Sequence, residues 1–328
     1  MSAARSGRPT VVVTRRLPAP VEEQLTREFD ARLNPTDRPL SPEELADALR
    51  GADALLPTVT DRLTAQVLAA EPLRARIIAN YGVGFNHIDT TSAKARGLVV
   101  TNTPDVLTDD TADDALMLML MVARRGGEGE RHLRAGAWTG WRPTHLLGTR
   151  VSGKTLGLIG LGRIGRAVAH RARSGFGMRV IFHDPYPPPP AVVAELGAES
   201  RGSVDEVLRE ADFVSLHSPA TPETRHLIDA RRLALMKRGA FLINNARGDI
   251  VDEAALVAAL KQGTIAGAGL DVFEREPAVT PDLLTMENVV LLPHLGSATR
   301  ETRTAMGLRA LDNLKAFFAG APPRDRVA

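Results

Sequence analysis

The segment GKTLGLIGLGRIGRAVA, residues 153–169, decides the fold class of this chain. It opens with an apolar run, passes through a G-x-G-x-x-G pattern, and ends in apolar residues at helical spacing. In a βαβ unit, such glycines let the backbone turn tightly and approach a pyrophosphate at the N-terminus of the helix. The segment therefore predicts a strand, a helix and a dinucleotide site that includes Gly160, Gly162 and Gly165.

The choice of dinucleotide depends on the end of the next predicted strand, MRVIFHD (178–184). Asp184 stands about 20 residues beyond the last glycine, where a carboxylate hydrogen-bonds a ribose 2′-hydroxyl and repels a 2′-phosphate. Pro185 and Tyr186 follow it, in place of a pair of arginines. The sequence thus predicts NAD, with NADP as the less favoured alternative.

Strand-like and helix-like segments alternate on both sides of this motif, which is typical of parallel sheets covered by helices. The sequence therefore predicts an α/β fold with two series of such segments. The predicted strands are TVVVTRRL, ADALLP, ARIIANYGVG, LVVTNTP, KTLGLIG, MRVIFHD, DFVSLHSP, GAFLINNARG, IAGAGLDV and NVVLLPH. The predicted helices are PAPVEEQLTREF, SPEELADALRG, TDDTADDALMLMLMVARR, residues 163–174, SVDEVLREA, VDEAALVAALKQG and RETRTAMGLRALDNLKAFFAG.

Several local signals refine this outline. In the long helix 108–125, aspartates crowd the first turn and arginines the last, which suits the helix dipole. Ser203 and Glu206 have the spacing of a capping box. An irregular arm that contains both tryptophans is expected over 126–150, and a stiff loop over the prolines of 185–190.

The bulk composition excludes several classes of function. The chain has 328 residues, enough for two domains, and no cysteine, so disulfides and thiolate chemistry are excluded. Its net charge is +2 without a basic stripe, and its histidines lack metal-ligand spacing, so we expect neither a nucleic-acid partner nor a metal site. No segment has the length of a membrane span, and the start lacks the apolar core of a signal peptide. We expect a soluble cytoplasmic protein.

Titratable side chains gather where predicted strands of the second series end. Arg247 follows AFLINN, Asp271 ends IAGAGL, His294 follows NVVLL, and His217 ends DFVSL. Open α/β sheets bind their ligands along the carboxyl ends of the strands. Glu276 lies five residues after Asp271 and can fold back toward the same edge. Taken alone, His294 reads as a core histidine, but the shared edge favours a functional group.

Such an arginine, glutamate and histidine suit the reduction of a 2-oxo acid. A guanidinium offers a planar fork to a carboxylate and an adjacent carbonyl oxygen. An imidazole protonates that oxygen as hydride arrives, and a carboxylate beside the ring orients it and favours its charged form. We therefore predict Arg247 as the anchor of the substrate, and His294 with Glu276 as the acid/base pair.

The chain resembles the D-isomer-specific 2-hydroxyacid dehydrogenases, and the residues of its motifs are most similar to those of the glyoxylate/hydroxypyruvate reductase branch. The matching blocks run in order over about residues 75–300. They are ANYGVGFNHID, TNTPDVLTDDTADDAL, GKTLGLIGLGRIGRAVA, FLINNARGDIVDEAAL, GAGLDVFEREP and LPHLGSAT. The resemblance implies Arg247, Glu276 and His294 as the catalytic set.

The resemblance also implies a domain arrangement and further contacts. A cofactor domain (106–293) is inserted into a substrate domain made of 1–105 and 294–328, both Rossmann-like or flavodoxin-like. The backbone of Val83 and Gly84 receives the substrate carboxylate, and the protein is a homodimer. The implied cofactor contacts, besides the motif glycines, are Thr111, Arg163, Ile164, Asp184, His217, Pro219, Ala246, Asp271 and Gly296.

Several alternatives stay open at this level. The substrate can be glyoxylate or hydroxypyruvate, or a larger acid such as 2-keto-gluconate; formate is disfavoured because Glu276 stands where formate-oxidising relatives carry glutamine. A non-catalytic NAD(H)-sensing protein is the rival from another class. We read His87 as a surface residue of the substrate domain. Trp141 either anchors the arm or narrows the substrate pocket of a partner subunit.

Overall fold

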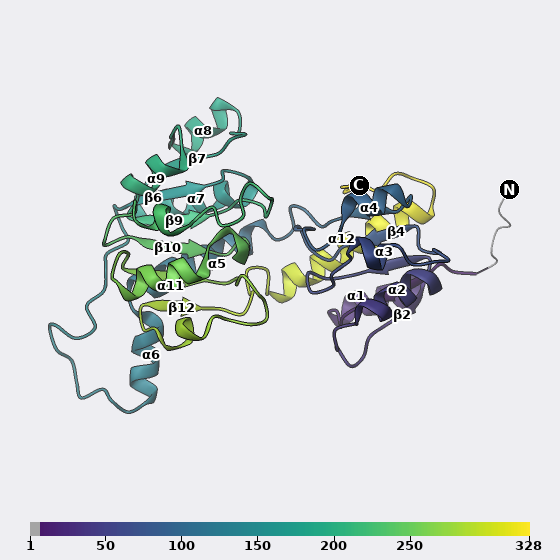
Figure 1. Ribbon diagram of the computed structural model, residues 1–328, viewed down its shortest axis with the longest axis horizontal. Coiled ribbons are helices and arrows are strands. Elements are labelled where there is room, and N and C mark those ends of the chain that lie inside the picture. The colour runs from purple at the N-terminus through teal and green to yellow at the C-terminus, as the bar shows by residue number, and fades with distance from the viewer. Residues whose placement is uncertain (1–6) are drawn as a thin grey trace. The chain divides into compact units, whose positions relative to one another are not determined.

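A computed structural model describes residues 7–328, and within them the chain divides into two compact units. The first unit takes the chain up to Leu107 together with Thr299–Ala328, and the second unit is Thr108–Ala298. In Figure 1 the purple and blue elements of the first unit therefore share their fold with the yellow helix α12. The start of the chain, for which no signal peptide is expected, lies partly outside the described residues.

The boundaries of these units differ from those implied by the resemblance. The first crossing falls after Leu107 instead of residue 105, and the second after Ala298 instead of residue 293. His294 therefore lies in the second unit, together with Arg247 and Glu276. Backbone contacts account for this, because the His294 N–H donates to the Asp271 carbonyl, 2.9 Å away.

The first unit is a parallel sheet in the order β2-β1-β3-β4-β5. Its short strands β3 and β4 are apolar and buried, whereas β2 is a polar edge strand that hydrophobic pattern does not predict. The strands are β1 (Thr10–Val13), β2 (Asp30–Arg32), β3 (Ala54–Leu56), β4 (Ile77–Ala79) and β5 (Val99–Thr101). The helices are α1 (Ala19–Glu28), α2 (Pro42–Gly51), α3 (Ala65–Leu68), α4 (Thr90–Ala95) and α12 (Arg300–Phe318).

Local signals explain how several of these helices begin and pack. Ser41 and Glu44 form a reciprocal capping box at the start of α2. Helix α12 packs on α1 at Gly307, where a Cβ would come within 2.6 Å of the Val21 methyl groups. The short helices α3 and α4 were not predicted, because one or two turns carry too little periodicity to recognise.

The second unit is a parallel sheet in the order β12-β11-β10-β9-β6-β7-β8. The chain leaves β6 toward β7 and β8, then returns to the other side of β6 to form β9, so the strand order reverses between β6 and β9. Ligands of open α/β sheets bind at the carboxyl ends of the strands at such a point. The strands are β6 (Thr155–Ile159), β7 (Arg179–His183), β8 (Ala198–Ser200), β9 (Phe213–Leu216), β10 (Phe241–Asn244), β11 (Gly267–Leu270) and β12 (Val289–Leu291).

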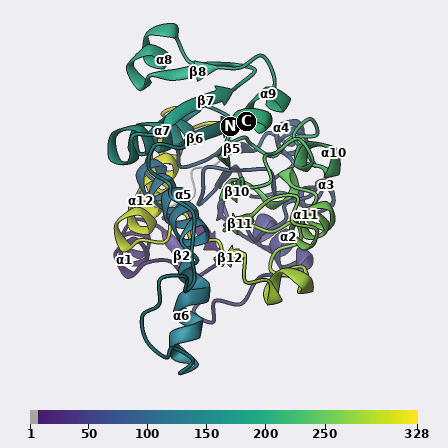
Figure 2. The same cartoon turned by 90° about the vertical axis from the view of Figure 1, so that its left-hand side faces the viewer.

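Helices cover both faces of this sheet. Helices α5 and α7 lie side by side on one face (Figure 2), over Phe241 and Ile243 of β10. Helices α9 and α11 cover the other face, where the alternate residue Leu242 is buried. The helices are α5 (Thr108–Ala123), α6 (Gly126–Arg134), α7 (Arg163–Phe176), α8 (Pro190–Leu196), α9 (Val204–Glu210), α10 (Ala230–Leu233) and α11 (Glu253–Lys261), with 3₁₀ turns at Gly248–Ile250 and Pro281–Thr285.

Three local predictions were wrong in part. The arm 126–150 is not irregular throughout, because α6 occupies its first part; this helix buries no residue and is rich in glycine, so no apolar periodicity announces it. The proline run is not only a loop, since Pro190 begins α8, where its missing N–H costs nothing. The capping box at Ser203 is half formed, because the Glu206 carboxylate accepts from Gly202 N–H instead.

In the part of the chain that the structure describes, no helix combines the length and the apolar character needed to cross a bilayer.

Candidate active site

The glycine-rich loop joins β6 to α7 at the point where the strand order reverses. Gly160 has φ of +98°, and a Cβ there would lie 2.7 Å from the His217 carbonyl oxygen. A Cβ on Gly165 would lie 2.4 Å from the Gly160 carbonyl oxygen. A Cβ on Gly162, by contrast, would meet nothing within 4 Å. The fold itself therefore requires two of these glycines, whereas the third leaves the open space that a pyrophosphate needs at the helix N-terminus.

Asp184 is tied to this loop. Its carboxylate accepts hydrogen bonds from the Leu161 N–H at 2.7 Å and from the Tyr186 N–H at 2.8 Å. Arg163 and Ile164 form the first turn of α7 directly after Gly162. The carboxylate thus stands beside the phosphate-binding turn, where a ribose hydroxyl of a bound dinucleotide would reach it.

His217 follows β9 on the other side of the same loop. Its ring Nε2 lies 2.9 Å from the Ser215 Oγ, and burial lowers the pKa of His217 to about 4. The ring is therefore neutral at physiological pH and serves the loop by packing and hydrogen bonding. Pro219, two residues on, is exposed, and its carbonyl accepts from Thr224 Oγ1 at 2.7 Å.

The two residues predicted as an acid/base pair, His294 and Glu276, are in contact. His294 Nδ1 lies 2.8 Å from a Glu276 carboxylate oxygen, and the other oxygen accepts from the Phe273 N–H at 3.0 Å. Burial alone would raise the pKa of Glu276, but the hydrogen bond and charge of His294 outweigh it and leave this pKa below its ordinary value. Because Nδ1 faces the carboxylate, Nε2 of His294 is the ring atom available for proton transfer.

The backbone at His294 is unusual and serves to aim the ring. Its φ is +56°, in the left-handed region that a residue other than glycine adopts at a cost of about 1–3 kcal/mol. The next two N–H groups, of Leu295 and Gly296, both donate to the Asp271 carboxylate, at 2.6 and 2.8 Å. Asp271 therefore holds the turn that presents His294.

Arg247 lies at the carboxyl end of β10, beside Ala246. The Arg247 Nη1 donates to the Ala246 carbonyl at 2.6 Å. The backbone carbonyl of Arg247 accepts a hydrogen bond from Asn244 Nδ2 at 2.9 Å. Burial lowers the pKa of Arg247, while the Glu276 and Asp249 carboxylates oppose the shift, and a guanidinium stays charged in proteins. The positively charged Arg247 and the Glu276 carboxylate therefore interact within the second unit.

Gly248 joins this arginine to the loop that carries Glu276. A Cβ on Gly248 would lie 1.9 Å from the Phe273 carbonyl carbon, a distance at which the backbone itself must move. The two backbones are therefore in direct contact. Any larger side chain at Gly248 would separate Arg247 from Glu276.

Sequence reasoning missed Glu253, which holds the same loop from α11. This buried carboxylate accepts from the Glu274 N–H at 2.6 Å and from the Thr280 hydroxyl. It thereby fixes both sides of Glu276. Glu253 is the first residue of α11, and in the sequence VDE (251–253) it looks like an ordinary acidic residue at a helix start. Only its contacts with the Glu276 loop reveal its role.

A second buried group, around Asp271, was also missed in part. A Cβ on Gly296 would lie 3.3 Å from Asp271 Oδ2, 3.5 Å from Thr111 Cγ2 and 3.8 Å from Asp114 Oδ2. The expected cofactor residues Thr111, Asp271 and Gly296 therefore lie together, and Asp114, which was not expected there, lies beside them. Asn245 Nδ2 donates to the Thr111 carbonyl at 2.7 Å and to Asp114 Oδ2 at 3.1 Å.

Asp114 lies beyond the first turn of α5, in which the acidic residues are Asp109 and Asp110. Asp109 and Asp113 pair with Arg171, but Asp114 points inward and is 5% exposed. Burial, and then the charge of Asp271, raise the pKa of Asp114 to about 6. A carboxyl group with this pKa changes its charge close to neutral pH.

In the first unit, taken by itself, three successive carbonyls of the loop 82–85 accept hydrogen bonds. The Gly82 carbonyl accepts from the Thr103 N–H, the Val83 carbonyl from Asn102 Nδ2, and the Gly84 carbonyl from Asn80 Nδ2, all at 2.9–3.0 Å. In a trans peptide the following N–H points the opposite way. The N–H groups of Val83, Gly84 and Phe85 donate to no group in the described residues.

Comparison with known proteins agrees with this geometry. The family model described as "D-isomer specific 2-hydroxyacid dehydrogenase, NAD binding domain" matches residues 116–296. This chain belongs to the D-isomer-specific 2-hydroxyacid dehydrogenases. It is therefore an NAD(P)-dependent oxidoreductase, and the two parallel-sheet units are the fold of this family.

Three relatives illustrate the similarity. The chain is 48% identical over 320 residues to a glyoxylate reductase of Thermococcus kodakarensis, covering 96% of this chain and 95% of the relative. A solved structure from Thermus thermophilus matches with 45% identity and a TM-score of 0.89, over 97% of this chain and all of that one. An NADPH-dependent glyoxylate/hydroxypyruvate reductase of Sinorhizobium meliloti, solved with NADP and malonate, matches with 38% identity and a TM-score of 0.87, over 98% and 97% of the two chains.

Proposed function

We propose that this dehydrogenase reduces small 2-oxo acids, glyoxylate and hydroxypyruvate first, to D-2-hydroxy acids. The observation that carries the proposal is the 2.8 Å contact between His294 and Glu276, with Arg247 in the same unit. The similarity to a glyoxylate reductase over almost the whole chain supports the choice of substrate.

Each residue then has a defined part in the reaction. The nicotinamide, when bound, supplies the hydride. Arg247 binds the carboxylate and the adjacent carbonyl oxygen, and neutralises the negative charge that grows on that oxygen. His294 donates the proton from Nε2 to the oxygen, and Glu276 stabilises the charged ring and holds it in place. The N–H groups of Val83 and Gly84 bind the substrate carboxylate.

The test is the rate of NADH consumption with glyoxylate, hydroxypyruvate, pyruvate and 2-keto-gluconate, for the wild type and His294→Ala. We expect turnover with glyoxylate and hydroxypyruvate, and a loss of at least about 100-fold in kcat for the variant. The matched control is His226→Ala, since His226 also contacts a carboxylate, Glu274, at 2.9 Å. A preference for 2-keto-gluconate would show that the substrate is this larger acid and not glyoxylate or hydroxypyruvate. NADH binding without turnover of any acid would favour a sensing protein.

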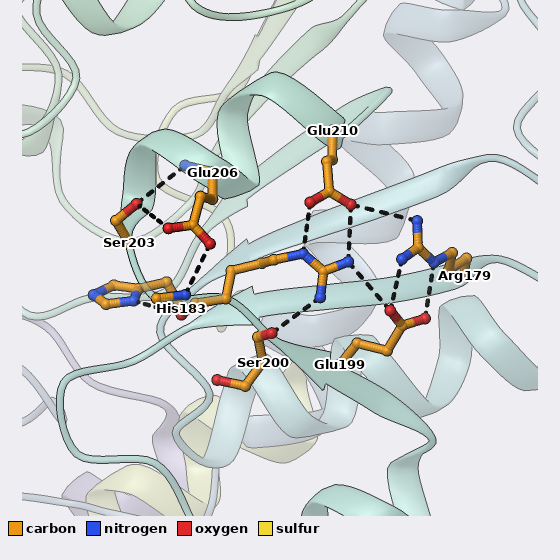
Figure 3. A network of polar contacts seen from close by, with 9 residues as sticks. Arg179, His183, Glu199, Ser200, Ser203, Glu206 and Glu210 are labelled. Carbon is orange, nitrogen blue, oxygen red and sulfur yellow. Dashed lines mark hydrogen bonds and ion pairs between the residues drawn. The ribbon is translucent and has the colours of Figure 1, made fainter.

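We further propose a preference for NADH over NADPH, because Arg201, which follows the strand next to that of Asp184, is already paired with glutamates. Arg201 follows β8, where its carbonyl accepts from His183 Nδ1 at 3.0 Å. Its guanidinium pairs with Glu210 at 2.7 Å and Glu199 at 3.2 Å. Figure 3 shows these glutamates, with Arg179 beside Glu199, as one network of contacts.

The charge of a guanidinium held in this way is balanced by the two glutamates, so its attraction for a 2′-phosphate is weak, and Asp184 would repel one. We expect kcat/KM to favour NADH over NADPH by at least about tenfold in the wild type. Asp184→Ser should reduce that ratio by improving NADPH, while Asp205→Ser, which breaks ion pairs with Arg231 and Arg232 elsewhere, should not. A wild type that prefers NADPH would refute the argument.

We also propose that the protein is a homodimer whose arm meets the partner. Four large apolar side chains of this arm are 52–82% exposed, and they are Leu133, Trp138, Trp141 and Leu147. Light scattering measures the mass, and Trp141→Ala tests whether the arm affects the partner's pocket. A changed kcat/KM profile across 2-oxo acids of increasing length supports this role. An unchanged profile, equal to that of the exposed control Tyr186→Ala, excludes it.

A further inference from the structure

The loop 82–85 depends on one fully buried side chain, Asn80, which follows β4 directly. Its amide nitrogen donates to the Gly82 carbonyl at 3.0 Å and to the Gly84 carbonyl at 2.9 Å. An amide NH₂ group has two hydrogens, so both are used. Asn80 therefore holds the two glycine carbonyls of the loop from inside the unit.

The oxygen of this amide contacts a histidine, which helps to hold it in place. His87 Nε2 lies 2.9 Å from Asn80 Oδ1. If the amide were turned over, its oxygen would face two carbonyl oxygens and its nitrogen would face the imidazole. In the observed orientation the Asn80 oxygen accepts, so His87 must carry a proton on Nε2. His87 is half-buried, so it stands at the surface of the unit, as expected, and also contacts the buried Asn80.

The consequence lies on the other side of the loop. With the carbonyls of Gly82, Val83 and Gly84 all bonded inward, the N–H groups of the next residues are turned outward together. Successive N–H groups that converge in this way form a concave site for an anion. Unbonded carbonyls would be free to rotate, and each rotation would replace a donor by an acceptor facing the anion.

We propose that Asn80 is a positioning residue for the substrate carboxylate, and that His87 acts through it by fixing the amide. The inference rests on the proposed function, in which Val83 and Gly84 receive that carboxylate. Neither side chain touches the substrate. Their effect is on the direction of the backbone N–H groups, and so on the KM for carboxylate substrates.

The variants are chosen to separate this role from a loss of stability. Asn80→Ala removes both donors, Asn80→Asp places a repelling carboxylate at the same atoms, and His87→Ala removes the group that fixes the amide. His87→Gln keeps an N–H donor and should restore much of the effect. The control is Asn34→Ala, because Asn34 Nδ2 also donates to two backbone carbonyls of the first unit, those of Thr14 at 2.8 Å and Arg38 at 2.7 Å.

The measurement is steady-state kinetics with glyoxylate and with methylglyoxal, a carbonyl compound that lacks the carboxylate. We expect the KM for glyoxylate to rise about 10- to 100-fold in Asn80→Ala, more in Asn80→Asp and less in His87→Ala, with a much smaller change in kcat. Turnover of methylglyoxal and the Kd of NADH should stay within about twofold of the wild type. Thermal unfolding of each variant verifies that it is folded.

The outcomes distinguish the two proposals. A wild type that reduces no 2-oxo acid refutes the proposed function itself. A wild type that reduces glyoxylate, with variants whose KM is unchanged or whose loss is equal for both substrates, refutes the role of Asn80 alone. An effect of Asn34→Ala on KM as large as that of Asn80→Ala would also refute it, since it would trace the loss to stability.

Discussion

Asp114 offers a sharp test of the electrostatics around Asp271, whose carboxylate holds the turn that carries His294. Asp114 is 5% exposed, its carboxylate accepts a hydrogen bond from the Asn245 amide, and the Asp271 carboxylate lies near the same glycine, Gly296. Burial, and then the charge of Asp271, raise its pKa from 3.8 to about 6. Replacing it by asparagine keeps the shape and removes the ionisation.

The size and sign of the effect follow from the two pKa values. Between the unfolded value of 3.8 and the folded value of about 6, the folded protein holds a proton that the unfolded chain has lost. Ionisation therefore destabilises the fold above pH 6 by two units at 1.4 kcal/mol each, or about 3 kcal/mol. The cost falls to about half near pH 5 and vanishes below pH 4. Asp114→Asn should thus be the more stable protein at pH 8 and equal to the wild type at low pH.

Thermal unfolding of the wild type and Asp114→Asn at pH 5 and pH 8 checks this expectation. We expect the variant to unfold several degrees higher at pH 8 and to lose much of that gain at pH 5. Asp113→Asn is the control, because Asp113 is exposed and pairs with Arg171, so its removal should give no gain at either pH. A gain that is the same at both pH values, or a variant that is less stable at pH 8, would refute the reasoning.

Three further predictions concern the site. Gly162→Ala should leave thermal stability unchanged and raise the Kd of NADH by at least about tenfold, because its Cβ enters space that only a ligand needs; a large loss of stability would count against this. Gly248→Ala should lower kcat/KM by about 100-fold, since the Phe273 backbone must move away; activity near that of the wild type would show that the contact is unimportant. Glu276→Gln should lower kcat by at least about tenfold, because the ring of His294 loses the carboxylate that holds it; a kcat near that of the wild type would separate Glu276 from the proton transfer.

The sequence by itself determined the class of fold and the edge of the sheet at which the proposed catalytic residues lie. The glycine-rich motif, the alternation of strands and helices, and the polar residues at strand ends are all local patterns. Each of these patterns can be recognised within a short stretch of sequence, because apolar periodicity and turn geometry depend on residues only a few positions apart. Arg247 and His294 could therefore be placed at the ends of β10 and β12 without coordinates.

The tertiary structure decided which side chains meet and which are buried. Whether an aspartate of α5 faces solvent or Asp271, more than 150 residues away, depends on packing, which no local pattern records. The same holds for Glu253 beneath the Glu276 loop. Asn80 stands next to its loop in sequence, but its part became visible only when its two donated bonds and its partner His87 were placed. The position of a strand end follows from the local sequence, whereas the hydrogen-bond partners and the burial of a side chain depend on how distant segments pack in the folded protein.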